Sequence, residues 1–171
     1  MQKKKSKFLL RLKSKQYLRI FYGNLSNRSL FSVYLKSSKM AGNINQNLCV
    51  SLEQRLDVCL FRMNLVPTIF TSRQVLAHKK ISVNGIIKTS PGFLINKGDF
   101  ICVQPWENIN FLWLRCFNPK KIFSKSLSRP SYVEINPKIL CGVLLYVPKF
   151  MDVFYPSSVQ FNHVTDFFKL F

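Results

Sequence analysis

Acidic residues are scarce in this chain of 171 residues, which has 7 Asp and Glu against 26 Lys and Arg. The formal net charge is +19, and no acidic residue precedes Glu53. Acids this dispersed provide no paired carboxylates for acid–base catalysis. A field this positive repels itself unless an anionic partner neutralises it. Nucleic acid explains the excess best, because each neutralised phosphate releases counterions. An anionic membrane surface is the alternative.

Long hydrophobic runs are also missing. A membrane-spanning helix needs roughly 20 mostly apolar residues, and the longest apolar run here, "VLLYV" at 143–147, is far shorter. The sequence therefore predicts no membrane-spanning segment, and with nucleic acid as the favoured partner we expect no membrane partner. Hydrophobic residues still make up 47% of the chain and aromatic residues 14%, which is enough for a folded core.

Cysteine and histidine show no metal-binding spacing. The five cysteines are widely spaced and never form a Cys-x-x-Cys pair, and there are only two histidines. This favours a reducing compartment and argues against a disulfide framework, a structural zinc site and a bound cofactor. Motifs of nucleophilic, metal-dependent and nucleotide-binding enzymes are absent as well, so we expect no enzymatic activity.

Residues 51–63, "SLEQRLDVCLFRM", carry the clearest helical pattern, with apolar residues repeating along one face. Ser51 and Gln54 match a capping box, which predicts where this helix begins. Arg55 and Arg62 are seven residues apart, so we expect them to share one exposed face of the helix.

A second short helix is expected after a turn that begins at Asn64, a residue that tolerates the left-handed conformation. Thr71 and Gln74 match another capping box, which places the start of this helix. Arg73 and Lys80 are again seven apart and are expected to lie together on its outer side. The two helices then form a helix-turn-helix-like unit.

Strand patterns follow the second helix. Asn84-Gly85, between two β-branched runs, predicts a type I′ hairpin over 81–88. Further on, "INKGDFICV" at 95–103 predicts a strand pair broken at Gly98-Asp99. Residues 131–149 predict two more strands around a turn at Asn136-Pro137. Upstream, the basic N-terminal third predicts one or two helices around Gly23-Asn24.

The stretch "LEQRLDVCLFRMNLVPTIFTSRQVLAHKKISVNG" at 52–85, followed by "KGDFI" at 97–101, resembles the RNA-binding domain of the small-subunit ribosomal protein S4 family, also called uS4. The family pattern there is an L-E-x-R-L-D helix, a T-x-x-x-A-R-Q-L-V-x-H helix and an I-x-V-N-G hairpin. Fainter similarity flanks this domain at 17–35 and 131–148. Asn64 stands where glycine is usual and Ile69 where bacterial members often have arginine, which implies one phosphate contact fewer.

The patterns and the resemblance together predict an α+β fold in four parts. Residues 1–48 form a basic N-terminal arm and helical segment. Residues 49–104 form the S4-type RNA-binding domain, with two short helices followed by a small sheet with a hairpin. Residues 105–130 are a basic linker or insertion. Residues 131–171 are expected to pack back on the N-terminal region.

The resemblance implies a structural constituent of the small ribosomal subunit that binds small-subunit rRNA directly, nucleates assembly and supports translation near the channel through which messenger RNA enters. Its expected partners are this rRNA, neighbouring small-subunit proteins and messenger RNA. The residues expected to bind rRNA are Arg55, Arg62, Arg73, Gln74, His78, Lys79, Lys80, Asn84 and Lys88 in the domain, and Lys3, Lys4, Lys5, Lys7 and Arg11 in the arm.

Two other functions stay open. Pseudouridine synthases carry a similar small module and an "RLD" motif with a catalytic aspartate, which would be Asp57 here. The short chain argues against such an RNA-modifying enzyme, and Asp57 is expected to orient Arg55 or a neighbouring helix instead. A stand-alone ribosome-associated factor is the other alternative. The frequent Phe, Lys, Ile and Asn favour a mitochondrial ribosome, with a plastid ribosome as the alternative.

Overall fold

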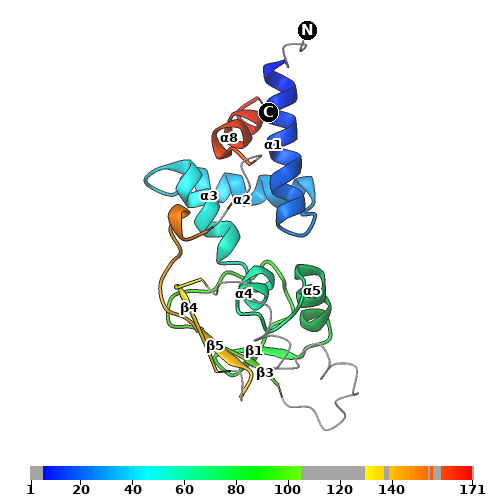
Figure 1. The fold of residues 1–171 in the computed structure, drawn as a ribbon, viewed down its shortest axis with the longest axis vertical. Coiled ribbons are helices and arrows are strands. Elements are labelled where there is room, and N and C mark those ends of the chain that lie inside the picture. The colour runs from blue at the N-terminus through cyan, green and yellow to red at the C-terminus, as the bar shows by residue number, and fades with distance from the viewer. Residues whose placement is uncertain (1–5, 105–129, 137–138, 154, 156–158, 171) are drawn as a thin grey trace. The chain divides into compact units, whose positions relative to one another are not determined.

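The computed structural model describes residues 6–104, 130–136, 139–153, 155 and 159–170 (Figure 1). In these residues, six α-helices and a five-stranded antiparallel sheet confirm the predicted α+β class. The chain divides into two compact units. We call residues 1–52 together with 149–171 the terminal unit, and residues 53–148 the helix–hairpin module.

The terminal unit begins with two helices, α1 (Lys7–Phe21) and α2 (Asn27–Lys39), joined by a tight turn at Gly23 and Asn24. Each helix follows a serine whose hydroxyl accepts a hydrogen bond from an amide of the first turn. This satisfies one of the donors that a helix start leaves unpaired. The predicted pair of helices around Gly23-Asn24 is confirmed.

Three further elements belong largely to this unit: α3 (Ile44–Glu53), the 3-10 helix η1 (Phe150–Asp152) and α8 (Phe161–Phe168). Figure 1 shows α8 lying beside α1, although these helices come from opposite ends of the chain. Their packing joins the two ends into one folded unit.

The core of the terminal unit is aromatic. The Phe168 ring lies 5.6 Å from the Phe31 ring and 5.0 Å from the Tyr34 ring, measured between centroids. Elsewhere in the unit, the hydroxyl groups of Tyr22 and Tyr155 share a hydrogen bond. Edge-to-face and offset ring pairs of this kind add to the free energy of burial.

The helix predicted over 51–63 is interrupted in the structure. α4 runs only over Leu56–Arg62, and Arg55 before it is extended and forms a β-bridge with Leu94. Backbone pairing with this distant loop replaces the helical hydrogen bonds at the break. The capping box predicted at Ser51 is therefore wrong, because Ser51 lies inside α3.

The second helix, α5 (Ile69–Ala77), begins earlier than predicted. Thr68 is its N-cap, and the Thr68 hydroxyl accepts a hydrogen bond from the Thr71 amide at 3.1 Å. The capping box predicted at Thr71 and Gln74 is therefore wrong, although the residue type at the cap is the expected one. Asn64, with φ 53°, ends the preceding helix as predicted.

The hairpin between β1 (Ile81–Val83) and β2 (Ile86–Ile87) is confirmed. Asn84 and Gly85 have φ of 51° and 81°, the positive values that a type I′ turn requires at both central positions. The hairpin extends from the exit of α5.

The sheet has the order β2-β1-β3-β5-β4 and is completed by β3 (Phe100–Val103), β4 (Val133–Asn136) and β5 (Cys141–Leu144). The strand pair predicted around Gly98 is wrong, since a turn there leads into the single strand β3. The two strands predicted after residue 130 are present. They belong to the module's sheet, and residues 149–171 group with the N-terminal helices.

β5 approaches the end of α4 closely. A Cβ atom on Gly142 would lie 2.8 Å from Met63 Sδ and 3.1 Å from the Glu134 carbonyl oxygen. Only glycine fits there without displacing a neighbour. The close contact ties the second half of the sheet to the helices.

A disulfide joins β3 and β5. Cys102 and Cys141 are directly opposite in the register, with their Cα atoms 4.2 Å apart. This corrects the expectation of cysteines without disulfides, because the sheet brings together residues 39 positions apart. Cys49 and Cys59 are buried and lie outside the disulfide. The cysteine content therefore no longer supports a reducing compartment.

Candidate nucleic-acid interface

Asp57, in the first turn of α4, is fully buried and holds two arginines. Arg55 donates to it from Nε at 3.1 Å and from Nη2 at 3.0 Å. Arg73 Nε donates at 2.9 Å, and the Val58 amide donates at 3.0 Å. Asp57 thus orients Arg55 and the neighbouring helix α5, as predicted. Two guanidinium groups share one carboxylate, so the cluster keeps a net positive charge.

Glu53, at the end of α3, forms a second buried anchor. Arg62 donates to its carboxylate from Nε at 3.0 Å and from Nη2 at 2.9 Å, a bidentate pair. The Tyr132 hydroxyl donates at 3.0 Å from the loop before β4. The sequence-based predictions missed this role. The available signal was that Glu53 and Asp57 are the first two acids in a strongly basic chain, within an apolar helical pattern.

The exposed face predicted for Arg55 and Arg62 is wrong. Arg55 is only 5% exposed, and its guanidinium is held within the protein by Asp57. Arg62 is also largely buried against Glu53. Arg73 differs from both, because a quarter of its side chain remains exposed. The break in the helix at Arg55 explains the wrong prediction. Residues seven apart share a face only along a continuous helix, and α4 begins after Arg55.

Several exposed polar groups of the module lie at the end of α5 and at the hairpin. Lys79 has φ of 58° and turns the chain from α5 into β1. Lys80 and Lys88 are brought close because the Lys88 amide donates to the carbonyl of Ile81, the residue after Lys80, at 3.1 Å. Of the predicted residues, the following are exposed or partly exposed here: Gln74, His78, Lys79, Lys80 and Lys88. We call this set, with Arg73, the cationic face.

Asn84 has a structural role at the hairpin tip. Its side-chain amide donates to Asp99 Oδ1 at 2.9 Å, and its Oδ1 accepts from the Phe100 amide at 2.9 Å. These bonds tie the hairpin to the turn before β3. Its expected contact with rRNA stays a prediction, and the internal contacts already explain the residue.

Burial shifts the pKa of three groups in the module. Burial raises the pKa of the Cys59 thiol, and the nearby carboxylates add to the rise, so the thiol is neutral and unreactive. Burial, followed by the charge of Glu53, raises the pKa of Tyr132, in keeping with a hydroxyl that donates to a carboxylate. Desolvation lowers the pKa of the Lys80 amino group.

Comparison with known proteins places the sequence in one family. A family model described as "S4 domain" matches residues 54–101, which span α4, α5 and the hairpin. The small ribosomal subunit protein uS4 of Rhodospirillum rubrum is 33% identical over 167 residues, covering 98% of this chain and 79% of that protein. The protein of the same name from Caulobacter vibrioides is 32% identical over 170 residues, covering 98% and 80%. The protein uS4m of Reclinomonas americana is 30% identical over 167 residues, covering 95% and 66%.

The chain belongs to the uS4 family. Its relatives are ribosomal structural proteins and not enzymes, which confirms the expectation of no enzymatic activity and disfavours the RNA-modifying alternative. The S4 match ends at residue 101, whereas the sheet continues through β5 and β4. In this uS4 chain the module therefore extends beyond the matched domain.

Two of the five predicted N-terminal contacts, Lys7 and Arg11, lie on α1. Lys7 is exposed at the start of this helix. Arg11 Nη2 lies 3.9 Å from Asp166 Oδ2 of α8, a partly exposed ion pair. Lys3, Lys4 and Lys5 lie outside the described residues.

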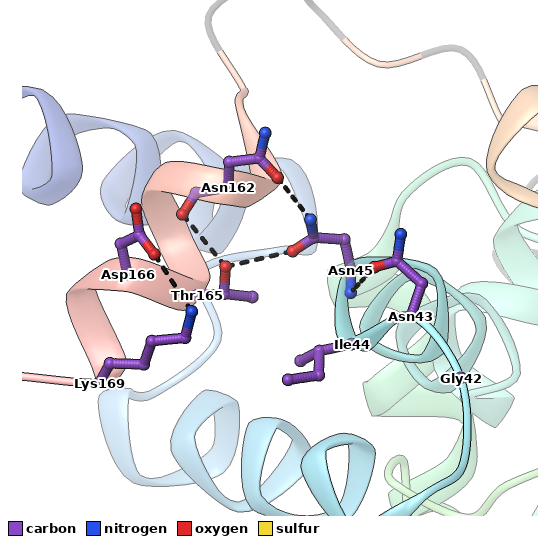
Figure 2. A pocket seen from close by; sticks show the side chains of 8 residues that line it. All are labelled: Gly42, Asn43, Ile44, Asn45, Asn162, Thr165, Asp166 and Lys169. Atoms are coloured by element: carbon purple, nitrogen blue, oxygen red, sulfur yellow. Dashed lines mark hydrogen bonds and ion pairs between the residues drawn. The ribbon is translucent and has the colours of Figure 1, made fainter.

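A hollow of about 490 Å³ in the terminal unit has no catalytic arrangement (Figure 2). Asn45 donates to Asn162 and accepts from the Thr165 hydroxyl, so these side chains tie α3 to α8. Asp166 is the single carboxylate among the lining residues, and Lys169 donates to it at 3.4 Å. The hollow holds neither a nucleophile with a base nor a pair of carboxylates.

Within the described ranges, no helix combines the length and apolar character needed to cross a bilayer. In the same part of the chain, no three His, Cys, Asp or Glu side chains come together as a metal site.

Proposed function

We propose that this uS4 chain is a structural constituent of the small ribosomal subunit that binds small-subunit rRNA through the cationic face. The observation that carries this proposal is the buried Asp57 with its two arginines. An internal carboxylate fixes the helices, while the lysines at the end of α5 and at the hairpin are exposed or partly exposed. Membership of the uS4 family supports the same role.

The face suits the RNA backbone. Lys79, Lys80 and Lys88 lie on a helix exit and a two-strand hairpin, elements whose backbone is held by hydrogen bonds. Folded RNA is recognised largely by its shape and by phosphate contacts. Each neutralised phosphate releases counterions, so binding through these lysines weakens as salt rises.

The test replaces these three lysines with glutamine and measures affinity for small-subunit rRNA at several salt concentrations. We expect the slope of log affinity against log salt to fall by about 2 to 3, on the order of 0.7 to 0.9 for each lost phosphate contact. Thermal unfolding should stay nearly unchanged, because the replaced side chains are exposed or partly exposed. Arg73 is left intact, since its replacement would also disturb Asp57.

The matched control replaces Lys36, Lys39 and Lys149, exposed lysines of the terminal unit, with glutamine. An equal loss of slope in the control would show that RNA binding depends on overall charge and not on this face.

For the place in the cell, we propose that the protein nucleates assembly of a mitochondrial small subunit near the channel through which messenger RNA enters. The composition and the similarity to the Reclinomonas protein uS4m support the compartment. Fractionated organelles should contain the chain in small subunits at about one copy per particle after a salt wash. Loose association below one copy, or plastid ribosomes as its location, would contradict this.

A further inference from the structure

The outward stripe of α5 carries an aromatic ring. Phe70, Gln74 and His78 lie one turn apart along it, and all three are exposed. Phe70 is 62% exposed although it is a large apolar residue. Packing inside the module does not explain this position, because Val75 and Leu76 supply the buried side of the helix.

The guanidinium group of Arg73 lies next to the Phe70 ring. The guanidinium carbon lies 5.7 Å from the Phe70 ring centroid, within the range of a cation–π contact. The same guanidinium is fixed by its bond to buried Asp57 at 2.9 Å. Phe70 is therefore a ring with a positioned cation beside it and much of its surface open.

We propose that Phe70 is a stacking platform for one unpaired base of the bound RNA. This inference rests on the proposed function and adds a base contact to a face otherwise built for phosphates. Single-stranded bases in RNA are commonly recognised by stacking on aromatic side chains.

The surroundings favour RNA over a protein partner. The ring lies beside a guanidinium, and α5 carries no carboxylate. Gln74, one turn further along the stripe, offers a carboxamide that can bond to the edge of a base. A partner protein would have to be acidic and would then compete with the RNA for the same cations.

The test compares variants of the full chain for binding to small-subunit rRNA. Phe70→Ala should weaken binding about 5- to 150-fold, the effect of removing an aromatic ring that stacks on a base. The salt slope should stay unchanged, because no charge is removed. Phe70→Trp should bind nearly as well as the original chain. Phe70→Leu, which keeps apolar volume without a planar ring, should bind about as weakly as the alanine variant.

Ile139→Ala is the matched control, because Ile139 is in the same unit and is 58% exposed. It should leave the affinity unchanged. Binding by Phe70→Leu at the original affinity would overturn the stacking role. Unchanged binding by Phe70→Ala, with the original chain still binding in a salt-dependent way, would overturn this inference alone. Failure of the original chain to bind rRNA would overturn the proposed function as well.

A second readout identifies the partner directly. With p-benzoylphenylalanine in place of Phe70, irradiated small subunits should show a crosslink from the chain to rRNA. A crosslink to a ribosomal protein instead would overturn the proposal.

Discussion

In the helix–hairpin module the described arginines, Arg55, Arg62 and Arg73, are anchored by buried carboxylates, whereas in the terminal unit cations lie on helices packed by aromatic rings. Asp57 and Glu53 each bond to arginine within the module. In the terminal unit, the buried Lys15 has its amino group 4.1 Å from the centroid of the Phe167 ring. Burial, then the charge of Arg19, lowers the pKa of Lys15. The same excess of positive charge thus has two different structural supports.

This difference has a consequence for mutation. A buried carboxylate that holds two helices cannot be removed without leaving arginines uncompensated inside the protein. Packing between aromatic rings depends on buried ring surface and on ring geometry, and it needs no buried ion pair. The module should therefore be sensitive to loss of charge, and the terminal unit to loss of rings.

The largest effect is expected for Asp57→Asn. Arg55 would remain buried without its carboxylate, and breaking a buried pair in this way costs about 3 to 5 kcal/mol. Hydrogen exchange should show lost protection within residues 53–104, together with a lower midpoint of urea unfolding.

Asp166→Asn is the control for this change, since Asp166 forms partly exposed pairs with Arg11 and Lys169. Exposed pairs contribute about 1 kcal/mol or less. If both variants lost the same stability, the proposed difference between the two units would be wrong.

A slightly smaller effect is expected for Phe168→Ala in the terminal unit. The ring is buried and packs on Phe31 and Tyr34, so its loss should cost about 3 kcal/mol. Hydrogen exchange should rise in α1, α2 and α8. Leu170→Ala, at a site that is 54% exposed, should change stability by no more than about 0.5 kcal/mol. A large effect of the leucine change would indicate that α8 is held by something other than its rings.

Local signals were sufficient to predict the features that depend on neighbouring residues. The Asn84-Gly85 hairpin, the helices around Gly23 and the end of α4 at Asn64 follow from backbone preferences, which act over a few residues. The predictions failed where contact with a distant segment of the chain determines the local structure. The bridge between Arg55 and Leu94 breaks the predicted helix, and the pairing of β3 with β5 brings two cysteines together.

The same limit applies to the candidate site. Spacing predicted that Arg73 and Lys80 lie together on the outer side of one helix, but α5 ends at Ala77, before Lys80. Spacing also could not show that Arg55 is buried, because that depends on the break and on Asp57. Phe70 was missed because the capping box predicted at Thr71 left this residue in the turn before the helix, whereas α5 begins at Ile69.

A small effect on stability is expected for Arg11→Gln in the terminal unit, and it is most informative beside Arg73→Gln in the module. Arg11 pairs with Asp166 at 3.9 Å near the surface, so its loss should cost less than about 1 kcal/mol. Arg73 donates to a fully buried carboxylate, and its loss should cost about 1 to 3 kcal/mol.

If each arginine also meets a phosphate, both variants should lower the salt slope of rRNA binding by about 1. Urea unfolding and binding at several salt concentrations measure the two effects separately. An Arg11 variant as unstable as the Arg73 variant would mean that the terminal unit also depends on ion pairs.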